Sequence, residues 1–144
     1  GKAASLAEAA AGCELFVVGI PPTPATLRVI SADVIRALPK GSLFVLVTRM
    51  AVVDQEALWE RVRKGEIRAA VDVFDPEPPP PDAPFRLDPN VIPTPHLAGN
   101  TRVCHRRCFE YACADAVAVL DGEKPRYAAG LRDYFIYQRK EESP

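Results

Sequence analysis

The fold is decided by residues 43–74, which read LFVLVTRMAVVDQEALWERVRKGEIRAAVDVF. The stretch begins with an apolar run over 43–47 and ends with another over 67–74. Between the runs, Asp54 is a good helix N-cap and Gly65 is a good helix-ending residue. Uninterrupted apolar runs are typical of strands that are covered on both faces. The stretch therefore predicts a strand–helix–strand unit with a right-handed crossover.

The sequence on either side continues this alternation. Two further apolar runs predict strands at Cys13–Ile20 and Val91–Ile92. Helical patterns with suitable end residues are the basis for three more helices. These are expected over Leu6–Ala11, from the N-cap Ser31 to Leu38, and from Thr101 to about Leu120. Strands that alternate with helices predict an α/β fold around a parallel sheet.

Composition limits the classes of protein to consider. The 144 residues are 48% hydrophobic and 26% charged, which is ordinary for a soluble globular domain with one core. Lys plus Arg is 18 and Asp plus Glu is 19, so nucleic acid is not the expected partner. No apolar run is long enough to cross a membrane, and no signal peptide is apparent at the start. Four cysteines are expected as reduced thiols in a cytoplasmic protein.

Four chemically active side chains follow the predicted strands. Arg49 follows the second strand, Asp72 and Glu77 lie at and after the third, and His96 follows the fourth. In parallel sheets, ligands gather at the carboxyl ends of the strands. A guanidinium binds a carboxylate through two hydrogen bonds, and an imidazole beside a carboxylate exchanges protons near neutral pH. The set favours proton transfer on a small substrate that carries a carboxylate.

Several motifs occur in an informative order. They are LPKG at 38–41, Arg49 five residues before the Asp of VVD, DVFDPEP at 72–78, and TPHLAG at 94–99. From about Leu6 to Tyr127 the chain resembles the second half of the cofactor domain of D-isomer-specific 2-hydroxyacid dehydrogenases. The resemblance implies a Rossmann-like parallel sheet with flanking helices. It also implies hydride transfer between a nicotinamide cofactor and a 2-keto or 2-hydroxy acid.

The resemblance also implies roles for particular residues. Arg49 matches the arginine that binds the substrate carboxylate. His96 matches the histidine that protonates the keto oxygen, and Glu77 matches the acid paired with it. The positions that match the lining of the cofactor site are Ile20, Val47, Thr48, Arg49, Asp72, His96, Ala98 and Gly99. The implied cofactor is NAD, with NADP left open.

Two departures from the family pattern affect the interpretation. Met50 stands where the family usually has glycine after its arginine, so we expect the loop to take another path or to crowd the ligand. The phosphate-binding fingerprint G-x-G-x-x-G is absent, since no two of the eight glycines are separated by one residue. We therefore expect a truncated chain that holds only the C-terminal half of the fold, without the Gly-rich first βαβ unit. Such a chain should be inactive alone.

The expected organisation is a partial NAD(P)-binding domain over 1–122 and a tail over 123–144, a possible remnant of the substrate domain. A non-catalytic NAD-binding or assembly module from the same family is the alternative. The expected partner is a small 2-keto or 2-hydroxy acid, and a homodimer of the full-length form stays open. Fifteen prolines, nine of them within 76–95, predict a locally rigid loop.

Three side-chain groups outside this set have simpler readings. Cys104, His105 and Cys108 could hold a metal, but thiols on an apolar helical stripe favour packing, and no metal site is assigned. The cluster of Arg102, Arg106 and Arg107 favours a solvated or interface surface, with a cofactor-phosphate contact as the alternative. Trp59 is expected to be partly buried rather than part of a subunit contact.

Overall fold

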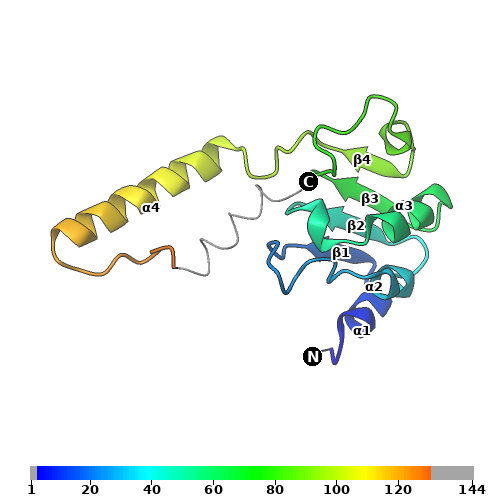
Figure 1. The fold of residues 1–144 in the computed structure, drawn as a ribbon, viewed down its shortest axis with the longest axis horizontal. Coiled ribbons are helices and arrows are strands. Elements are labelled where there is room, and N and C mark those ends of the chain that lie inside the picture. The colour runs from blue at the N-terminus through cyan, green and yellow to red at the C-terminus, as the bar shows by residue number, and fades with distance from the viewer. Residues whose placement is uncertain (1–2, 131–144) are drawn as a thin grey trace. The chain divides into compact units, whose positions relative to one another are not determined.

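The computed structural model describes residues 3–130. The chain divides into two compact units, Gly1–His96 and Leu97–Pro144, and each is described by itself. The first unit contains the whole sheet, and the second contains one long helix (Figure 1).

Four parallel strands form one sheet in sequence order. They are β1 (Leu15–Val18), β2 (Leu43–Leu46), β3 (Arg68–Val71) and β4 (Val91–Pro93). The predicted parallel arrangement is confirmed. The first three strands are shorter than their apolar runs, because at the carboxyl ends the chain leaves the ladder and enters the loops that carry the polar side chains.

Three helices connect or precede the strands: α1 (Leu6–Ala11), α2 (Ala32–Ala37) and α3 (Gln55–Arg63). The Asp54 carboxylate accepts from the backbone N–H of Ala57 and caps α3 as predicted. Gly65 ends this segment with φ +66°, a conformation that favours glycine. Ser31 occupies the N-cap position of α2, but its hydroxyl makes no capping hydrogen bond.

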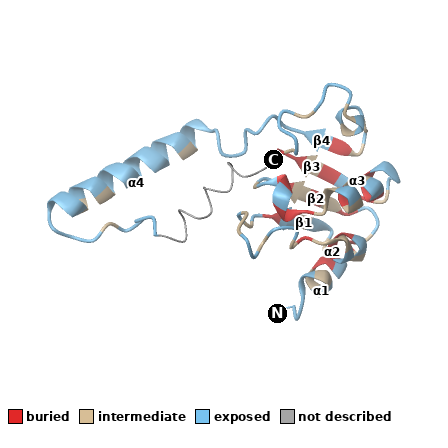
Figure 2. Cartoon of the chain, viewed as in Figure 1, coloured by how far each residue is buried: buried red, intermediate tan, exposed pale blue. Residues whose placement is uncertain are grey.

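The core of the first unit lies on one face of the sheet. Phe44, Leu46, Ala69 and Val71 are fully or almost fully buried together with the inner residues of α2 and α3 (Figure 2). The expectation that the strands are covered on both faces is wrong for this unit. Leu15 and Val17, which point to the opposite face of β1, are each 57% exposed. The helices of residues 3–96 cover one face only, so alternate residues of β1 stay open.

The second unit is built on α4 (Arg102–Leu120), which begins at the Thr101 N-cap as predicted. The Asp115 carboxylate accepts from the backbone N–H groups of Arg126 and Tyr127, and the rings of Tyr111 and Tyr127 stack 4.9 Å apart. These contacts hold the start of the predicted tail against α4. Most of that tail, residues 131–144, lies outside the described residues. None of the helices within 3–130 has the length and hydropathy needed to span a bilayer.

Candidate active site

The carboxyl ends of β2, β3 and β4 bring three predicted side chains together. His96 Nδ1 lies 2.7 Å from Glu77 Oε1, and His96 Nε2 lies 3.2 Å from Arg49 Nη1. Glu77 lies 19 positions before His96 in the sequence, and Arg49 lies 47 positions before it. The parallel sheet makes these distant residues neighbours. The imidazole and carboxylate side chains are 40% and 35% exposed, which leaves the group accessible to a small molecule.

The backbone of His96 has an uncommon conformation. Its φ is +56°, in the left-handed region that a residue with a Cβ adopts at a cost of roughly 1–2 kcal/mol. Its N–H donates to the carbonyl of Thr94, two residues earlier, in a tight turn. A strained backbone conformation persists only where surrounding contacts hold the residue in place, and such residues are concentrated at functional sites. Here the two ring contacts and the turn all act on one residue.

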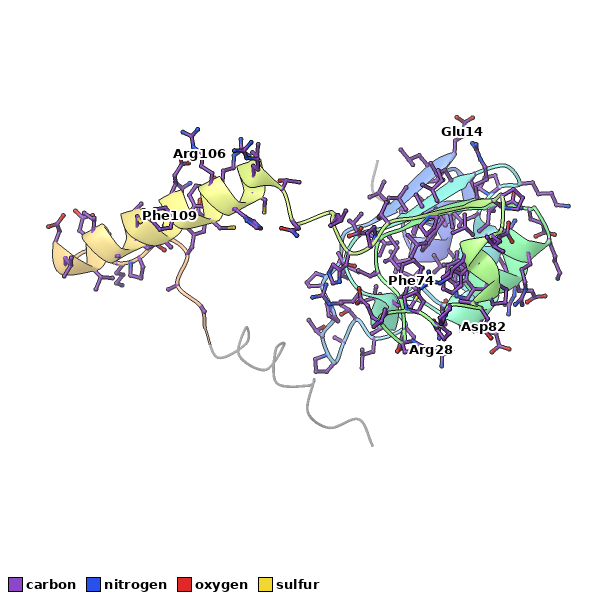
Figure 3. All side chains as sticks on the ribbon, turned by 90° about the horizontal axis from the view of Figure 1, so that it is seen from above. Glu14, Arg28, Phe74, Asp82, Arg106 and Phe109 are labelled. Atoms are coloured by element: carbon purple, nitrogen blue, oxygen red, sulfur yellow. The ribbon has the colours of Figure 1, made fainter. Side chains whose placement is uncertain are left out.

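The proline-rich loop that carries Glu77 is held in two ways. The ring of Phe85 stacks between Trp59 on α3, 4.7 Å away, and Phe74, 5.0 Å away. The Arg86 guanidinium donates to two carbonyls of the same loop, those of Pro79 and Pro80, at 2.7 and 2.8 Å. Figure 3 shows Phe74 within the dense side chains of the first unit. The partial burial of Trp59 agrees with the prediction from sequence, and the stiffness of the loop stays a prediction.

Met50, which stands where the family usually has glycine, lies in the core of the first unit. It begins a short 3₁₀ helix, η1 (Met50–Val52), and is only 3% exposed. Burial of this apolar side chain is favourable, and it directs the side chain into the core of the first unit. Its neighbour Arg49 projects outward and donates to the carbonyl of Thr48 at 2.7 Å.

A second polar pair lies at the ends of β3 and β4. Asp72 is 3% exposed, and its carboxylate accepts from the hydroxyl of Thr94. Sequence reasoning identified Asp72 but missed Thr94, although Thr94 opens the TPH motif. A buried carboxylate needs hydrogen-bond donors, and this requirement is the signal that points to a nearby hydroxyl.

The remaining predicted cofactor positions fall into two groups. Ile20 is half-buried after β1, and Val47 is 41% exposed after β2. Ala98 and Gly99 form a turn in the second unit, closed by a hydrogen bond from Asn100 to Leu97. The Thr48 hydroxyl oxygen is buried and, among the described residues, has no hydrogen-bond partner. An orphaned hydroxyl at a strand end fits a site that accepts a polar group from a cofactor such as a nicotinamide.

Two other features do not coincide with this site. A cavity of about 410 Å³ lies between α3 and the segment η2 (Pro84–Arg86), and its lining includes none of Arg49, Glu77 and His96. Within residues 3–130, no group of three or more His, Cys, Asp or Glu side chains could hold a metal ion. A hydrogen bond with Cys108 raises the pKa of the Cys104 thiol, which is opposite to what metal ligation by a thiolate requires.

Comparison with known proteins gives the site its context. The profile of the family described as "D-isomer specific 2-hydroxyacid dehydrogenase, NAD binding domain" matches residues 1–98. The chain belongs to this family. The matched residues include Arg49, Glu77 and His96, which meet at the strand ends.

Individual relatives agree. A glyoxylate reductase of Thermofilum pendens is 35% identical over 113 residues, which cover 78% of this chain and 33% of that protein. A D-3-phosphoglycerate dehydrogenase of Archaeoglobus fulgidus is 32% identical over 84% of this chain and 23% of that protein. A solved D-isomer specific 2-hydroxyacid dehydrogenase of Xanthobacter autotrophicus, in complex with NADPH and MES, superimposes with a TM-score of 0.76. The two chains are 34% identical, and the superposition covers 87% of this chain and 51% of that one. The chain thus spans a third or less of these two curated relatives.

Proposed function

We propose that this chain supplies the carboxylate-binding and proton-donating part of a nicotinamide-dependent 2-hydroxyacid dehydrogenase. The observation that carries the proposal is the contact of His96 with Glu77 on one ring nitrogen and Arg49 on the other. A guanidinium, an imidazole and a carboxylate within hydrogen-bond distance are what reduction of a 2-keto acid needs besides hydride. The names of the relatives, glyoxylate reductase and D-3-phosphoglycerate dehydrogenase, support this substrate class.

Each side chain has a distinct task. A bound nicotinamide cofactor, NAD or NADP, supplies the hydride to the carbonyl carbon. Arg49 orients the substrate through two parallel hydrogen bonds to its carboxylate. His96 gives the proton on Nε2 to the keto oxygen, and Glu77 holds Nδ1 and stabilises the imidazolium. Thr48, Asp72 and the exposed Val47 would hold the nicotinamide end of such a cofactor.

The pyrophosphate end of the cofactor requires residues outside this chain. No two of the eight glycines have the G-x-G spacing of the turn whose backbone N–H groups receive the two phosphates. We propose that residues 1–122 are the second half of an NAD(P)-binding domain and that another segment completes it. Residues 123–144 would then lead toward the substrate domain.

The proposal is tested by supplying the missing half. The chain is joined behind the amino-terminal part of the Thermofilum pendens glyoxylate reductase, and glyoxylate-dependent oxidation of NADH and NADPH is measured. We expect turnover that His96→Asn abolishes; asparagine tolerates the left-handed backbone, so loss of folding is not the cause. Arg36→Met, on the surface of α2, is the matched control for charge and should retain activity. A joined protein that binds NADH but reduces none of glyoxylate, hydroxypyruvate and pyruvate would instead support a non-catalytic assembly module.

A further inference from the structure

The two contacts of His96 determine where its proton resides. A guanidinium carries N–H donors and no acceptor, so in the contact between Arg49 Nη1 and His96 Nε2 the imidazole nitrogen accepts. That nitrogen therefore carries no proton. The single proton of the neutral ring is on Nδ1 and is donated to Glu77 Oε1 at 2.7 Å. The nitrogen that must deliver a proton to the substrate is the one that Arg49 covers.

We propose that Arg49 blocks the proton-donating nitrogen of His96 until a substrate carboxylate draws the guanidinium away. The inference rests on the proposed function, because it takes Arg49 as the carboxylate ligand and His96 as the acid. It adds an order of events: the carboxylate binds, the guanidinium leaves Nε2, and Nε2 takes up one proton from solvent. His96 is then protonated on Nε2 only when a substrate with a keto oxygen is present to receive the proton.

The relative strength of the contacts supports this order. A two-pronged hydrogen bond between a guanidinium and a carboxylate is charge-assisted on both sides, whereas the contact with a neutral imidazole is not. Arg49 is exposed, so a carboxylate can reach it without displacing core residues. The bond from Nη1 to the Thr48 carbonyl keeps the side chain close to the strand end when it moves.

The charges around the ring give the direction of the effect. Glu77 and Arg49 contact the ring from the loops after β3 and β2, and the buried Asp72 carboxylate is hydrogen-bonded to Thr94, two residues before His96. The carboxylates favour the charged ring, and the guanidinium disfavours it. Removal of the guanidinium should therefore let His96 hold its second proton up to a higher pH.

The test uses ¹⁵N spectra of the imidazole rings in the intact chain over a pH titration. The chain has two histidines, so His105 in the second unit is an internal reference. We expect the neutral His96 ring to carry its proton on Nδ1. Arg49→Met should raise the titration midpoint of His96 and leave that of His105 unchanged, because it removes the guanidinium that covers Nε2. A neutral ring protonated on Nε2, or equal shifts in Arg49→Met and Arg36→Met, would overturn the inference.

Oxamate, an unreactive analogue of a 2-keto acid, tests the release step in the joined protein with NADH bound, which has the segments that the proposed function assigns to the rest of the site. Oxamate should move the side-chain resonances of Arg49 and raise the His96 midpoint toward the value in Arg49→Met. If oxamate moves the Arg49 resonances but not the midpoint, the release step is wrong while the proposed carboxylate contact stands. If oxamate moves neither, Arg49 is not the carboxylate ligand and both the proposed function and the release step fail. In that case the ¹⁵N spectra of the neutral ring still show independently whether Nε2 of His96 lacks a proton.

Discussion

His96 combines a left-handed backbone with hydrogen bonds on both ring nitrogens. Each of these features restricts a different freedom: the turn to Thr94 restricts the backbone, Glu77 selects the tautomer, and Arg49 covers the remaining nitrogen. At the scale of single residues, this convergence is the strongest sign that the site is functional.

The negative charge of Glu77, the partner of His96, can be removed with little change in the shape of the Glu77 side chain. Glu77→Gln replaces the carboxylate with a neutral amide, so the protonated ring loses the charge that favours it. The titration midpoint of His96, followed by NMR, should therefore be lower in Glu77→Gln than in the unsubstituted chain. Asp82→Asn, on the same loop, is the control for loss of one negative charge. An unchanged midpoint in Glu77→Gln would show that the contact does not persist in solution.

Met50 has a role in stability because its side chain fills the core beside Arg49. Met50→Ala should lower the free energy of unfolding by about 3 kcal/mol, through lost burial and the cavity left behind. Met50→Leu keeps the volume and should cost less than about 1.5 kcal/mol. Urea denaturation measures both. Equal, small losses would mean that Met50 does not pack as the structure has it.

The loop from β3 to β4 positions Glu77 through contacts at a distance from it. Phe85→Ala removes the ring that stacks between Trp59 and Phe74. We expect a loss of about 2 kcal/mol in unfolding free energy and a fall in the His96 midpoint like that of Glu77→Gln. Phe16→Ala removes another partly buried ring, which stacks on Phe44 in the sheet. This control should lose stability but keep the His96 midpoint; the same midpoint change in both variants would contradict a specific role for the loop anchor.

Helix α3 is tied to α2 by a buried arginine. Arg61 is 8% exposed and donates from Nη1 to the carbonyls of Ile35 and Leu38 at 2.6 and 2.8 Å, at the end of α2. Its Nε donates to Glu66 at 2.8 Å. This hydrogen bond holds the pKa of Glu66 below its ordinary value of 4.5, against the opposing effect of partial burial.

The pKa of Glu66 gives this contact a pH dependence with a definite sign. A carboxylate with a lowered pKa in the folded state stabilises the protein above its unfolded pKa, and the contribution is lost as pH falls through the folded pKa. Glu66→Gln should therefore lower the urea midpoint at pH 7, and the difference from the unsubstituted chain should shrink at about pH 3. Glu60→Gln breaks the exposed pair with Lys64 and should have the smaller effect. A constant difference between pH 7 and acid would contradict this account.

At the scale of the whole molecule, the proposed function gives this chain the nicotinamide side of a dinucleotide site, while its sequence contains no G-x-G-x-x-G fingerprint. We expect the chain alone to bind NADH more weakly than micromolar, because its sequence lacks the Gly-rich turn that presents a helix N-terminus to the pyrophosphate. Fluorescence titration measures this affinity, and Arg36→Met is the control for nonspecific attraction of the phosphates. Micromolar or tighter binding to the chain alone would show that its own residues complete the site.

The sequence by itself determined that the strands lie parallel in one sheet, and it determined the approximate ends of the helices. These features follow from local patterns: apolar runs, capping residues, and a crossover whose handedness is nearly invariant. It also predicted that Arg49, Glu77 and His96 would meet, because the ends of neighbouring parallel strands share one edge. The roles of these residues stay predictions until the experiments above are done.

Only the tertiary structure decided which face of the sheet is covered, where the Met50 side chain goes, and how Glu77 is held. Each of these depends on packing between residues far apart in the chain, which no local pattern encodes. The open face at Leu15 and Val17 follows from all helices of the first unit lying on the other side. The contact of Arg49 with His96 Nε2 likewise depends on side-chain geometry across 47 positions of sequence. Long-range packing places hydrogen-bond donors and acceptors in three dimensions, and this placement determines which ring nitrogen carries the proton.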